Sequence, residues 1–291
     1  MKPAPFIYHD PSTIAEAAAL LSRHGNARAL AGGQSLMPMM NFRLVAPDHL
    51  VDLNGIAELA GVKQINGALT IGAMTRQRDL EFSPDIAAAL PILREALRHV
   101  GHRQTRNRGT IGGSLCHLDP SAELVNVVAL HDGVLTIASA GGTREAGFHT
   151  FATGAMTHSM RDDELLTAVS LTPWPRPRGY GFAETARRRG DFAIAAVGVL
   201  LTLDQDGAID RAALAVSGLT GVPVRLASVE TMLVGQRPSH DLFRAAAAGA
   251  ATLEAMEDPY ASAAYRRHLA RILTYRAMET ATARAREGAA K

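Results

Sequence analysis

Ala31-Gly32-Gly33-Gln34-Ser35 and Thr110-Ile111-Gly112-Gly113-Ser114 are the two stretches of this sequence that decide its fold. Each combines residues that lack a Cβ atom with a following hydroxyl, so that main-chain N–H groups can approach and hold a phosphate oxygen. The first stretch precedes Leu36 and Met37, which can open a helix whose positive end faces an anion. A pair of such glycine segments predicts a diphosphate, and therefore a nucleotide cofactor.

The common nucleotide-binding signatures are absent. The chain contains no G-x-G-x-x-G after a strand and no G-x-x-x-x-G-K-[ST]. These absences exclude Rossmann and P-loop folds. A single Gly-Gly pair is more often a tight turn between two elements, so the prediction depends on the two segments acting together.

The composition is that of an ordinary globular protein. The 291 residues suffice for two domains, and 47% hydrophobic residues build a sizeable core. Lysine and arginine number 30 against 28 aspartates and glutamates, which gives nucleic-acid binding little support. Residues 1–6 lack the apolar region of a signal peptide, and no apolar run has the length of a membrane span. We therefore expect a cytoplasmic protein.

Cysteine and histidine usage limits the metal chemistry. Cys116 is the only cysteine, so the chain has no internal disulfide and cannot itself hold an iron–sulfur cluster on thiolates. Any such cluster must lie in a partner. The chain has eleven histidines, but none has the spacing of a metal motif together with a carboxylate ligand, and we expect no metal site.

The sequence pattern predicts an α/β unit followed by a second subdomain. A helix from about Pro11 to His24 has Thr13 and Glu16 at capping-box spacing, and Asn54-Gly55 closes a strand. The type I′ turn Asn66-Gly67 joins strands at 62–65 and 68–71. Further predicted elements are a strand at 6–8, helices over 84–100 with a new turn at Pro91, and strands at 134–138 and 165–171.

The last third of the chain predicts a separate α+β unit. Residues 174–179, WPRPRG, interrupt both the strand and the helix periodicity and are the best candidate for a linker. Strands are predicted at 181–186, 193–203 and 208–217, and helices follow near 224–234, 241–256 and 261–285.

Three blocks of the sequence resemble one known family. Residues 109–124, GTIGGSLCHLDPSAEL, together with residues 31–35, are similar to the FAD-binding medium subunit of the molybdenum hydroxylases, which include carbon monoxide and xanthine dehydrogenases. Residues 181–193, GFAETARRRGDFA, resemble the start of that family's C-terminal domain.

The resemblance implies an α+β fold in two domains. The first is an FAD-binding domain of the vanillyl-alcohol-oxidase/PCMH type at residues 1–174, with subdomains at about 1–55 and 56–174. The second is a C-terminal domain at residues 178–288 with a three-stranded antiparallel sheet and a helical bundle.

The same resemblance implies the cofactor-binding residues. It places the main chain of two segments around the FAD pyrophosphate, namely Leu30, Ala31, Gly32, Gly33, Gln34, Ser35 and Leu36, and Thr110, Ile111, Gly112, Gly113 and Ser114. It places Glu123 against the FAD ribose, although a solvated Glu on a helix surface is the alternative. Asp119 either contacts FAD or acts as a turn or N-cap residue before Pro120.

Side chains from later in the chain complete the implied site. Phe192 corresponds to a residue that lies against the isoalloxazine ring, and its alternative is a buried phenylalanine in a strand. Leu165 and Leu166 are candidates for main-chain contacts to the flavin edge. The basic residues Arg103, Arg106 and Arg108 could attract the dianionic cofactor or contact an acidic neighbouring subunit, and their default interpretation is a solvated loop.

The function implied by the resemblance is electron transfer without a catalytic residue in this chain. FAD would take electrons from two [2Fe–2S] clusters in a small subunit, while a large subunit with molybdopterin oxidises the substrate, in an assembly of two copies of each chain. The alternatives are a stand-alone FAD-dependent oxidase or reductase of the vanillyl-alcohol-oxidase type, and a non-catalytic assembly protein. The substrate of the large subunit and the final acceptor, whether oxygen, NAD or a quinone, stay open.

Overall fold

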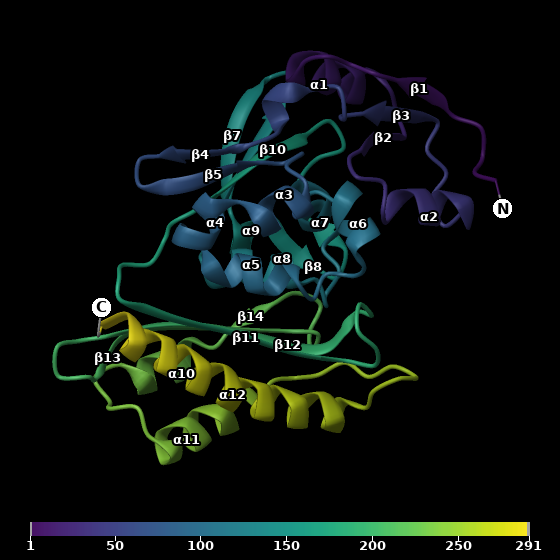
Figure 1. The fold of residues 1–291 in the computed structure, drawn as a ribbon. Helices are drawn as coiled ribbons and strands as arrows, with labels where there is room; N and C mark the ends of the chain where they lie inside the picture. The colour runs from purple at the N-terminus through teal and green to yellow at the C-terminus, as the bar shows by residue number, and fades with distance from the viewer. Residues whose placement is uncertain (1, 290–291) are drawn as a thin grey trace.

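Three main β-sheets follow one another along the length of the molecule, and helices fill the space between the second and the third (Figure 1). The computed structural model describes residues 2–289. A short two-stranded sheet, β8 (Ala152–Gly154) and β9 (Thr157–His158), adds to them. Within residues 2–289, no helix combines the length and the apolar character that a bilayer crossing requires.

The N-terminal sheet is parallel and small. Its strands lie in the order β1 (Ile7–His9), β3 (His49–Asp52), β2 (Ala27–Leu30), and the associated helices are α1 (Ile14–Arg23), α2 (Leu36–Asn41) and the 3₁₀ turn η1 (Ala57–Leu59). The Thr13 hydroxyl caps α1 by accepting from the Glu16 N–H. The Glu16 carboxylate in turn accepts from Ser12, so the predicted capping box closes one residue earlier than expected.

The middle sheet is antiparallel, in the order β4 (Val62–Ile65), β5 (Ala68–Gly72), β10 (Leu165–Leu171), β6 (Val134–Ser139), β7 (Gly142–Gly147). The predicted hairpin turn is confirmed, because Asn66 and Gly67 have φ angles of 49° and 81°, and a type I′ turn requires two positive values.

Short helices form the layer below this sheet: α3 (Gln77–Phe82), α4 (Pro84–Ala89), α5 (Pro91–Leu97), α6 (Arg103–Arg108), α7 (Ile111–His117), α8 (Glu123–Leu130) and α9 (Phe148–Phe151). Pro91 opens a new helix as predicted. Residues 103–108, whose default interpretation was a solvated loop, form α6. Arg106 in it donates to the Glu81 carboxylate at 2.9 Å and to the Val100 carbonyl, so this arginine has a structural role.

The C-terminal sheet has four strands, where three were expected. Its order is β11 (Arg178–Ala186), β12 (Ala193–Leu203), β13 (Ile209–Ser217), β14 (Val224–Arg225), and α10 (Ala227–Leu233), α11 (His240–Ala250) and α12 (Ala263–Ala289) follow. Val224 and Arg225, predicted as the start of a helix, pair with Val216 and Ala215 instead. The edge of β13 that faces away from β12 is thereby paired with a short strand.

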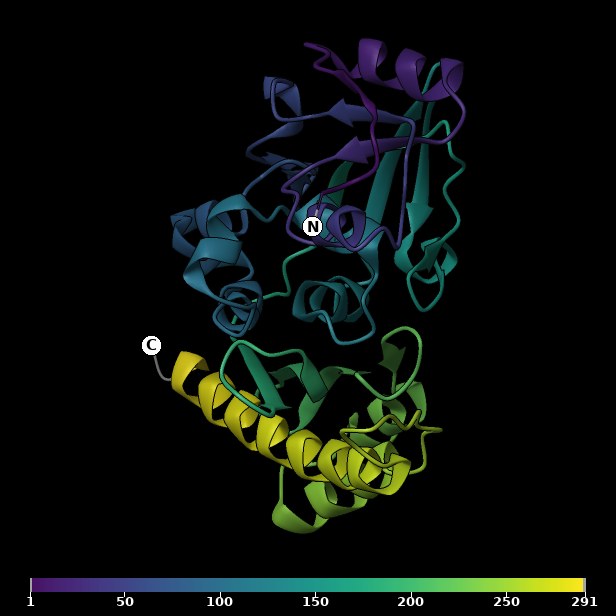
Figure 2. The same ribbon diagram turned by 90° about the vertical axis from the view of Figure 1, so that its right-hand side faces the viewer.

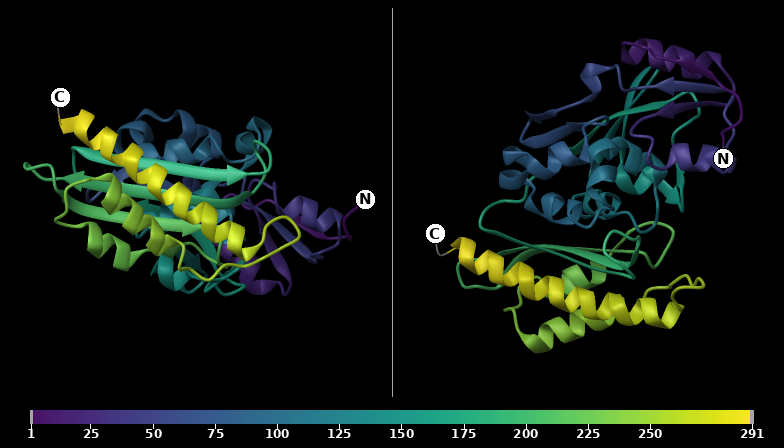
Figure 3. Two further views of the ribbon diagram at one scale, coloured as in Figure 1. Left: turned by 90° about the horizontal axis from the view of Figure 1, so that it is seen from below. Right: turned by 45° about the vertical axis from the view of Figure 1, so that its right-hand side comes forward.

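Strand β12 is buried on both faces, which explains its continuous apolar sequence. Ala196 and Leu200 belong to the core shared with α5 and α8, whereas Val197 and Val199 pack in the core that includes α12. The long helix α12 lies along one face of this sheet (Figures 2 and 3). The sheet is thus held between α8 on one side and α12 on the other.

Candidate cofactor site

The fold brings the two glycine segments side by side. A Cβ atom on Gly32 would overlap the main chain of Arg108 and Gly109, which directly precede the second segment. A Cβ atom on Gly113 would lie 3.6 Å from that of Ala31. The absence of side chains at these positions therefore allows the two segments to touch.

The first segment presents a row of unbonded main-chain donors. Within residues 2–289, the N–H groups of Gly32, Gly33, Gln34 and Ser35 donate to no protein acceptor. Gly33 has a φ of +72°, a conformation that glycine adopts without strain. Successive N–H groups next to a left-handed residue form a concave anion-binding nest. The segment therefore fits one phosphate group of a dinucleotide.

The second segment differs from the expected donor loop, because it is the start of a helix. Thr110 caps α7, and its hydroxyl accepts from the Gly113 N–H at 3.0 Å. The N–H groups of Ile111 and Gly112 donate to the carbonyls of Thr75 and Ala73, and that of Ser114 donates within the helix. Of these four donors, only the Gly113 N–H bonds to a side chain that can rotate away.

Two side chains that the sequence analysis missed join the segments. The Asn54 amide donates to the Ala31 carbonyl at 3.0 Å. Arg76 donates to the side-chain oxygen of Asn54 and to the Arg108 carbonyl. Burial, together with the nearby Arg108 charge, lowers the pKa of Arg76. Asn54 was noted only as part of a turn, and no motif marks Arg76.

Glu123 is buried at the first position of α8, so the interpretation as a solvated surface residue is wrong. Burial raises the pKa of its carboxyl to about 7, and the charge of Asp119 adds to this effect. Asp119 has the expected turn role, because its Oδ1 accepts from the Ser121 N–H at 2.8 Å. A contact of either residue with FAD stays a prediction.

Phe192 is an exposed aromatic residue at the boundary between the two halves of the molecule. Its exposed fraction is 68%, and it lies just before β12, so the alternative of a buried strand residue is wrong. The neighbouring chain is fixed, because Ser121 Oγ donates to the Ala193 carbonyl at 2.8 Å and Gly190 lies against the His102 ring. Phe192 is thus held near the segment that contains Asp119.

Leu165 and Leu166 lie on β10 with their side chains buried in two different cores. Their strand pairs with β6 at this point, opposite Ala138 and Ile137. Any contact with a flavin would involve their main chain, as the resemblance implies.

Two family descriptions match the chain. The FAD binding domain in molybdopterin dehydrogenase matches residues 4–175, and the CO dehydrogenase flavoprotein C-terminal domain matches residues 180–281. The chain belongs to the family of FAD-binding subunits of molybdopterin dehydrogenases. The open N–H row, the close approach at Gly32 and the exposed Phe192 fit a flavin dinucleotide.

Known members of the family align with this subunit from end to end. The 6-hydroxypseudooxynicotine dehydrogenase complex subunit alpha of Paenarthrobacter nicotinovorans is 37% identical, covering 98% of this chain and 97% of the relative. The carbon monoxide dehydrogenase medium chain of Afipia carboxidovorans is 35% identical, covering 98% and 100%.

Solved structures show the same fold. Quinoline 2-oxidoreductase from Pseudomonas putida 86 superposes with a TM-score of 0.94 at 34% identity, covering 98% of this chain and 99% of the solved one. The Cu,Mo-CO dehydrogenase in its cyanide-inactivated form gives 0.95 at 35% identity, covering 98% and 100%. The chain is therefore an FAD-binding medium subunit of the molybdenum hydroxylase type.

Proposed function

We propose that this subunit carries electrons between partner chains and an external acceptor. In this proposal, FAD on this chain takes electrons from two [2Fe–2S] clusters of a small subunit, and a large subunit with molybdopterin oxidises the substrate. The observation that carries the proposal is the open row of N–H groups from Gly32 to Ser35 beside the second glycine segment. The full-length similarity to medium chains of such complexes supports it.

The residues of this chain would bind and orient the cofactor. A bound flavin supplies the chemistry, accepting electrons singly or in pairs, and the protein supplies position and electrostatics. The N–H row would hold a phosphate, the Glu123 carboxyl would bond to ribose hydroxyls, and Phe192 would cover one face of the ring. None of these tasks requires a nucleophile or a general base.

We propose the same division of the chain that the sequence indicated, with a cofactor-binding domain at 1–174 and a C-terminal domain at 178–288. The two family matches, at 4–175 and 180–281, support this division. We also propose a cytoplasmic assembly with two copies of each of the three chains.

Exposed apolar side chains next to the glycine segment support a partner on this face. Phe42 and Leu44, which follow α2, are 64% and 73% exposed. Large apolar groups in such positions are typical of interaction sites.

Purification of the native complex with metal analysis tests the proposal. The expected result is two co-purifying chains with one molybdenum and about four iron atoms per FAD, as two [2Fe–2S] clusters require. An FAD-loaded chain that is rapidly reduced by a small organic substrate without any partner would instead establish the stand-alone oxidase. A colourless chain in the same complex would indicate an assembly protein.

Replacing Phe192 by alanine should weaken FAD binding about tenfold, because stacking of an aromatic ring contributes about 1 kcal/mol or more beyond its buried area. Flavin fluorescence should also rise as the ring loses its cover. Titration of the apoprotein with FAD measures both. Phe82→Ala, which removes another exposed ring, should leave both unchanged. Equal effects of the two variants would contradict the placement of Phe192.

Replacing Arg76 by methionine should weaken FAD binding by about tenfold, because two hydrogen bonds that hold the glycine segments together are lost. The matched control is Arg78→Met, since the Arg78 guanidinium lies 4.7 Å from the Phe82 ring centroid and, within residues 2–289, donates no hydrogen bond to these segments. Equilibrium titration with FAD distinguishes the variants. An unchanged affinity in Arg76→Met would show that the segments keep their arrangement without this side chain.

A further inference from the structure

Three histidines from separate parts of the chain meet in the N-terminal sheet. His9 ends β1, His24 follows the last residue of α1, and His49 opens β3. One ring nitrogen of each lies within 4.8 Å of the others. His9 Nε2 and His49 Nδ1 are 3.0 Å apart, and the rings of His24 and His49 stack with centroids at 4.1 Å.

The register of the sheet explains this meeting. Strands β1 and β3 are parallel, with His9 opposite Val51, so His9 and His49 point to the same face. Val51 packs on Ala17 and Leu21 of α1, which identifies that face as the one covered by the helix. His24 follows the last residue of α1, so its side chain meets those of His9 and His49 on the face of the sheet that the helix covers.

We propose that His9, His24 and His49 form a binding site for one divalent transition-metal ion, with Zn²⁺ as the physiological candidate. Imidazole nitrogens without thiolates or carboxylates select Zn²⁺, Cu²⁺, Ni²⁺ or Co²⁺ over Mg²⁺ and Ca²⁺. Three protein ligands leave a fourth position for water, as in many open zinc sites.

One nitrogen–nitrogen separation is close to that of two ligands on a single ion. Two nitrogens on one tetrahedral Zn²⁺ are about 3.3 Å apart, given bonds of about 2.0 Å. His9 Nε2 and His49 Nδ1, which are now joined by a hydrogen bond at 3.0 Å, lie close to this separation, and a bound ion would replace that hydrogen bond. The His24 ring, now stacked on His49, would have to turn so that its nitrogen faces the ion. Imidazoles bind a metal in their neutral form, and burial, with His49 next in effect, lowers the pKa of His24.

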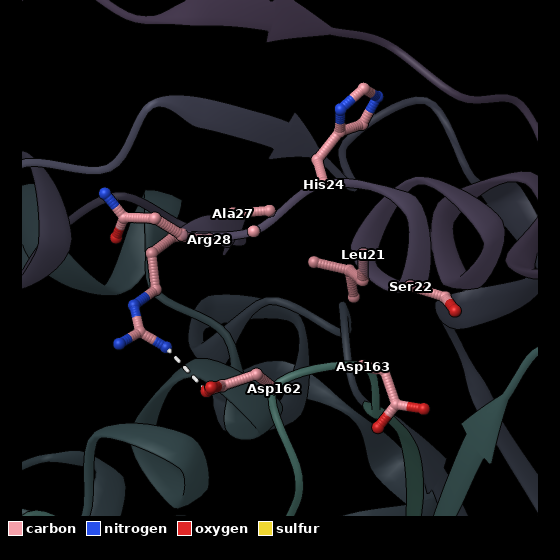
Figure 4. A pocket seen from close by; sticks show the side chains of 9 residues that line it. Leu21, Ser22, His24, Ala27, Arg28, Asp162 and Asp163 are labelled. Atoms are coloured by element: carbon pink, nitrogen blue, oxygen red, sulfur yellow. Dashed lines mark hydrogen bonds and ion pairs between the residues drawn. The ribbon is translucent and has the colours of Figure 1, made fainter.

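The surroundings show which charges act on the ion. The C-terminal end of α1 carries a partial negative charge, which favours a cation, whereas the exposed Arg23 opposes it. A hollow of about 510 Å³ lies beside His24 and is lined by Asp162 and Asp163 (Figure 4). The His24 ring points away from these carboxylates, and Asp162 pairs with Arg28 at 3.4 Å.

A simple ion-pair role does not account for the cluster. Among residues 2–289, no carboxylate lies within salt-bridge distance of His9, His24 or His49. Spacing within single motifs predicts no metal site here, because only the sheet and its helix bring the three residues together.

Metal titration of the FAD-loaded chain, produced without a histidine tag, tests the proposal. Equilibrium dialysis should find one Zn²⁺ per chain, and an excess of Mg²⁺ should not displace it. Co²⁺ in place of Zn²⁺ should give the visible absorption bands of a low-coordinate nitrogen site. The bound ion should also raise the melting temperature in proportion to the logarithm of its free concentration.

Single substitutions decide whether these residues hold the ion. His24→Gln and His9→Gln should each weaken Zn²⁺ binding at least tenfold, whereas His268→Gln, at an exposed position on α12, should not. FAD content and circular dichroism verify that each variant is folded. Because two cluster variants are made, the test still works if one of them fails to fold. The proposal is overturned if the wild-type chain binds no stoichiometric Zn²⁺, or if His268→Gln weakens binding as much as the cluster variants.

Discussion

Replacing Gly32 by alanine should lower FAD affinity by about 10- to 100-fold. The added methyl group has no space, because the main chain of Arg108 and Gly109 occupies the position of its Cβ. Overpacking against a main chain costs about 1 to 3 kcal/mol, and relief requires the two glycine segments to separate. The N–H row would then no longer lie beside Gly113. Titration of the apoprotein with FAD measures the loss.

The matched control for this variant is Gly147→Ala in β7, where a Cβ atom would meet no atom of the described residues within 4 Å. Its FAD affinity should equal that of the wild type. Thermal denaturation of both apoproteins separates a local effect from unfolding. Normal FAD binding by a folded Gly32→Ala variant would contradict the assignment of these segments to the pyrophosphate.

Replacing Glu184 by glutamine should stabilise the protein above pH 8 and leave it nearly unchanged at pH 5. The Glu184 side chain is 4% exposed, and its Oε2 has no hydrogen-bond partner among residues 2–289. Burial raises the pKa of this carboxyl to about 8, and the nearby Glu123 adds to the effect. His99 Nδ1 lies 3.8 Å away, but burial lowers its pKa, so the two groups form a neutral pair rather than an ion pair.

The direction of the effect follows from proton linkage. The folded protein holds the Glu184 proton more tightly than the unfolded chain, so the stabilisation is complete below pH 4.5 and is lost as the pH rises to about 8. The loss amounts to at most about 5 kcal/mol. Glutamine cannot ionise and avoids it. The melting temperature at pH 9 should therefore rise by about 5 °C or more relative to the wild type.

Melting curves from pH 5 to pH 9 provide the measurement, and Glu254→Gln, at an exposed position, is the control. The control should follow the wild-type pH dependence. A Glu184→Gln variant that loses stability in parallel with the wild type would show that Glu184 is ionised in the folded protein throughout this range.

Local chemistry determined much of the fold and could be predicted. Pro91 suits the first turn of a helix, because its φ is fixed near a helical value and it lacks an N–H that would stay unbonded there. Asn66-Gly67 accepts two positive φ angles that few other pairs tolerate. Strand β12 could be predicted from its long apolar run. The two-residue strand β14 could not be predicted, because it exists only through pairing with β13.

The candidate site was predictable where one segment carries the chemistry. The row from Gly32 to Ser35 is open as expected. Thr110, as the helix cap, accepts from the N–H groups of Gly113 and Ser114, which were expected to bind the pyrophosphate. This capping could be seen only in the structure. Asn54 and Arg76 act through partners distant in the chain, so no pattern in their own neighbourhood identifies them.

Because both faces of β12 are buried, one in each core, the stability of each half of the molecule depends on the other. Its inner residues Ala196 and Leu200 complete the interior of the first half, so removing the C-terminal half would expose that interior to water. Protease cleavage near Pro175 should thus release no separable fragment without denaturant. Unfolding of the C-terminal sheet should therefore accompany unfolding of the first half, because β12 contributes to both cores.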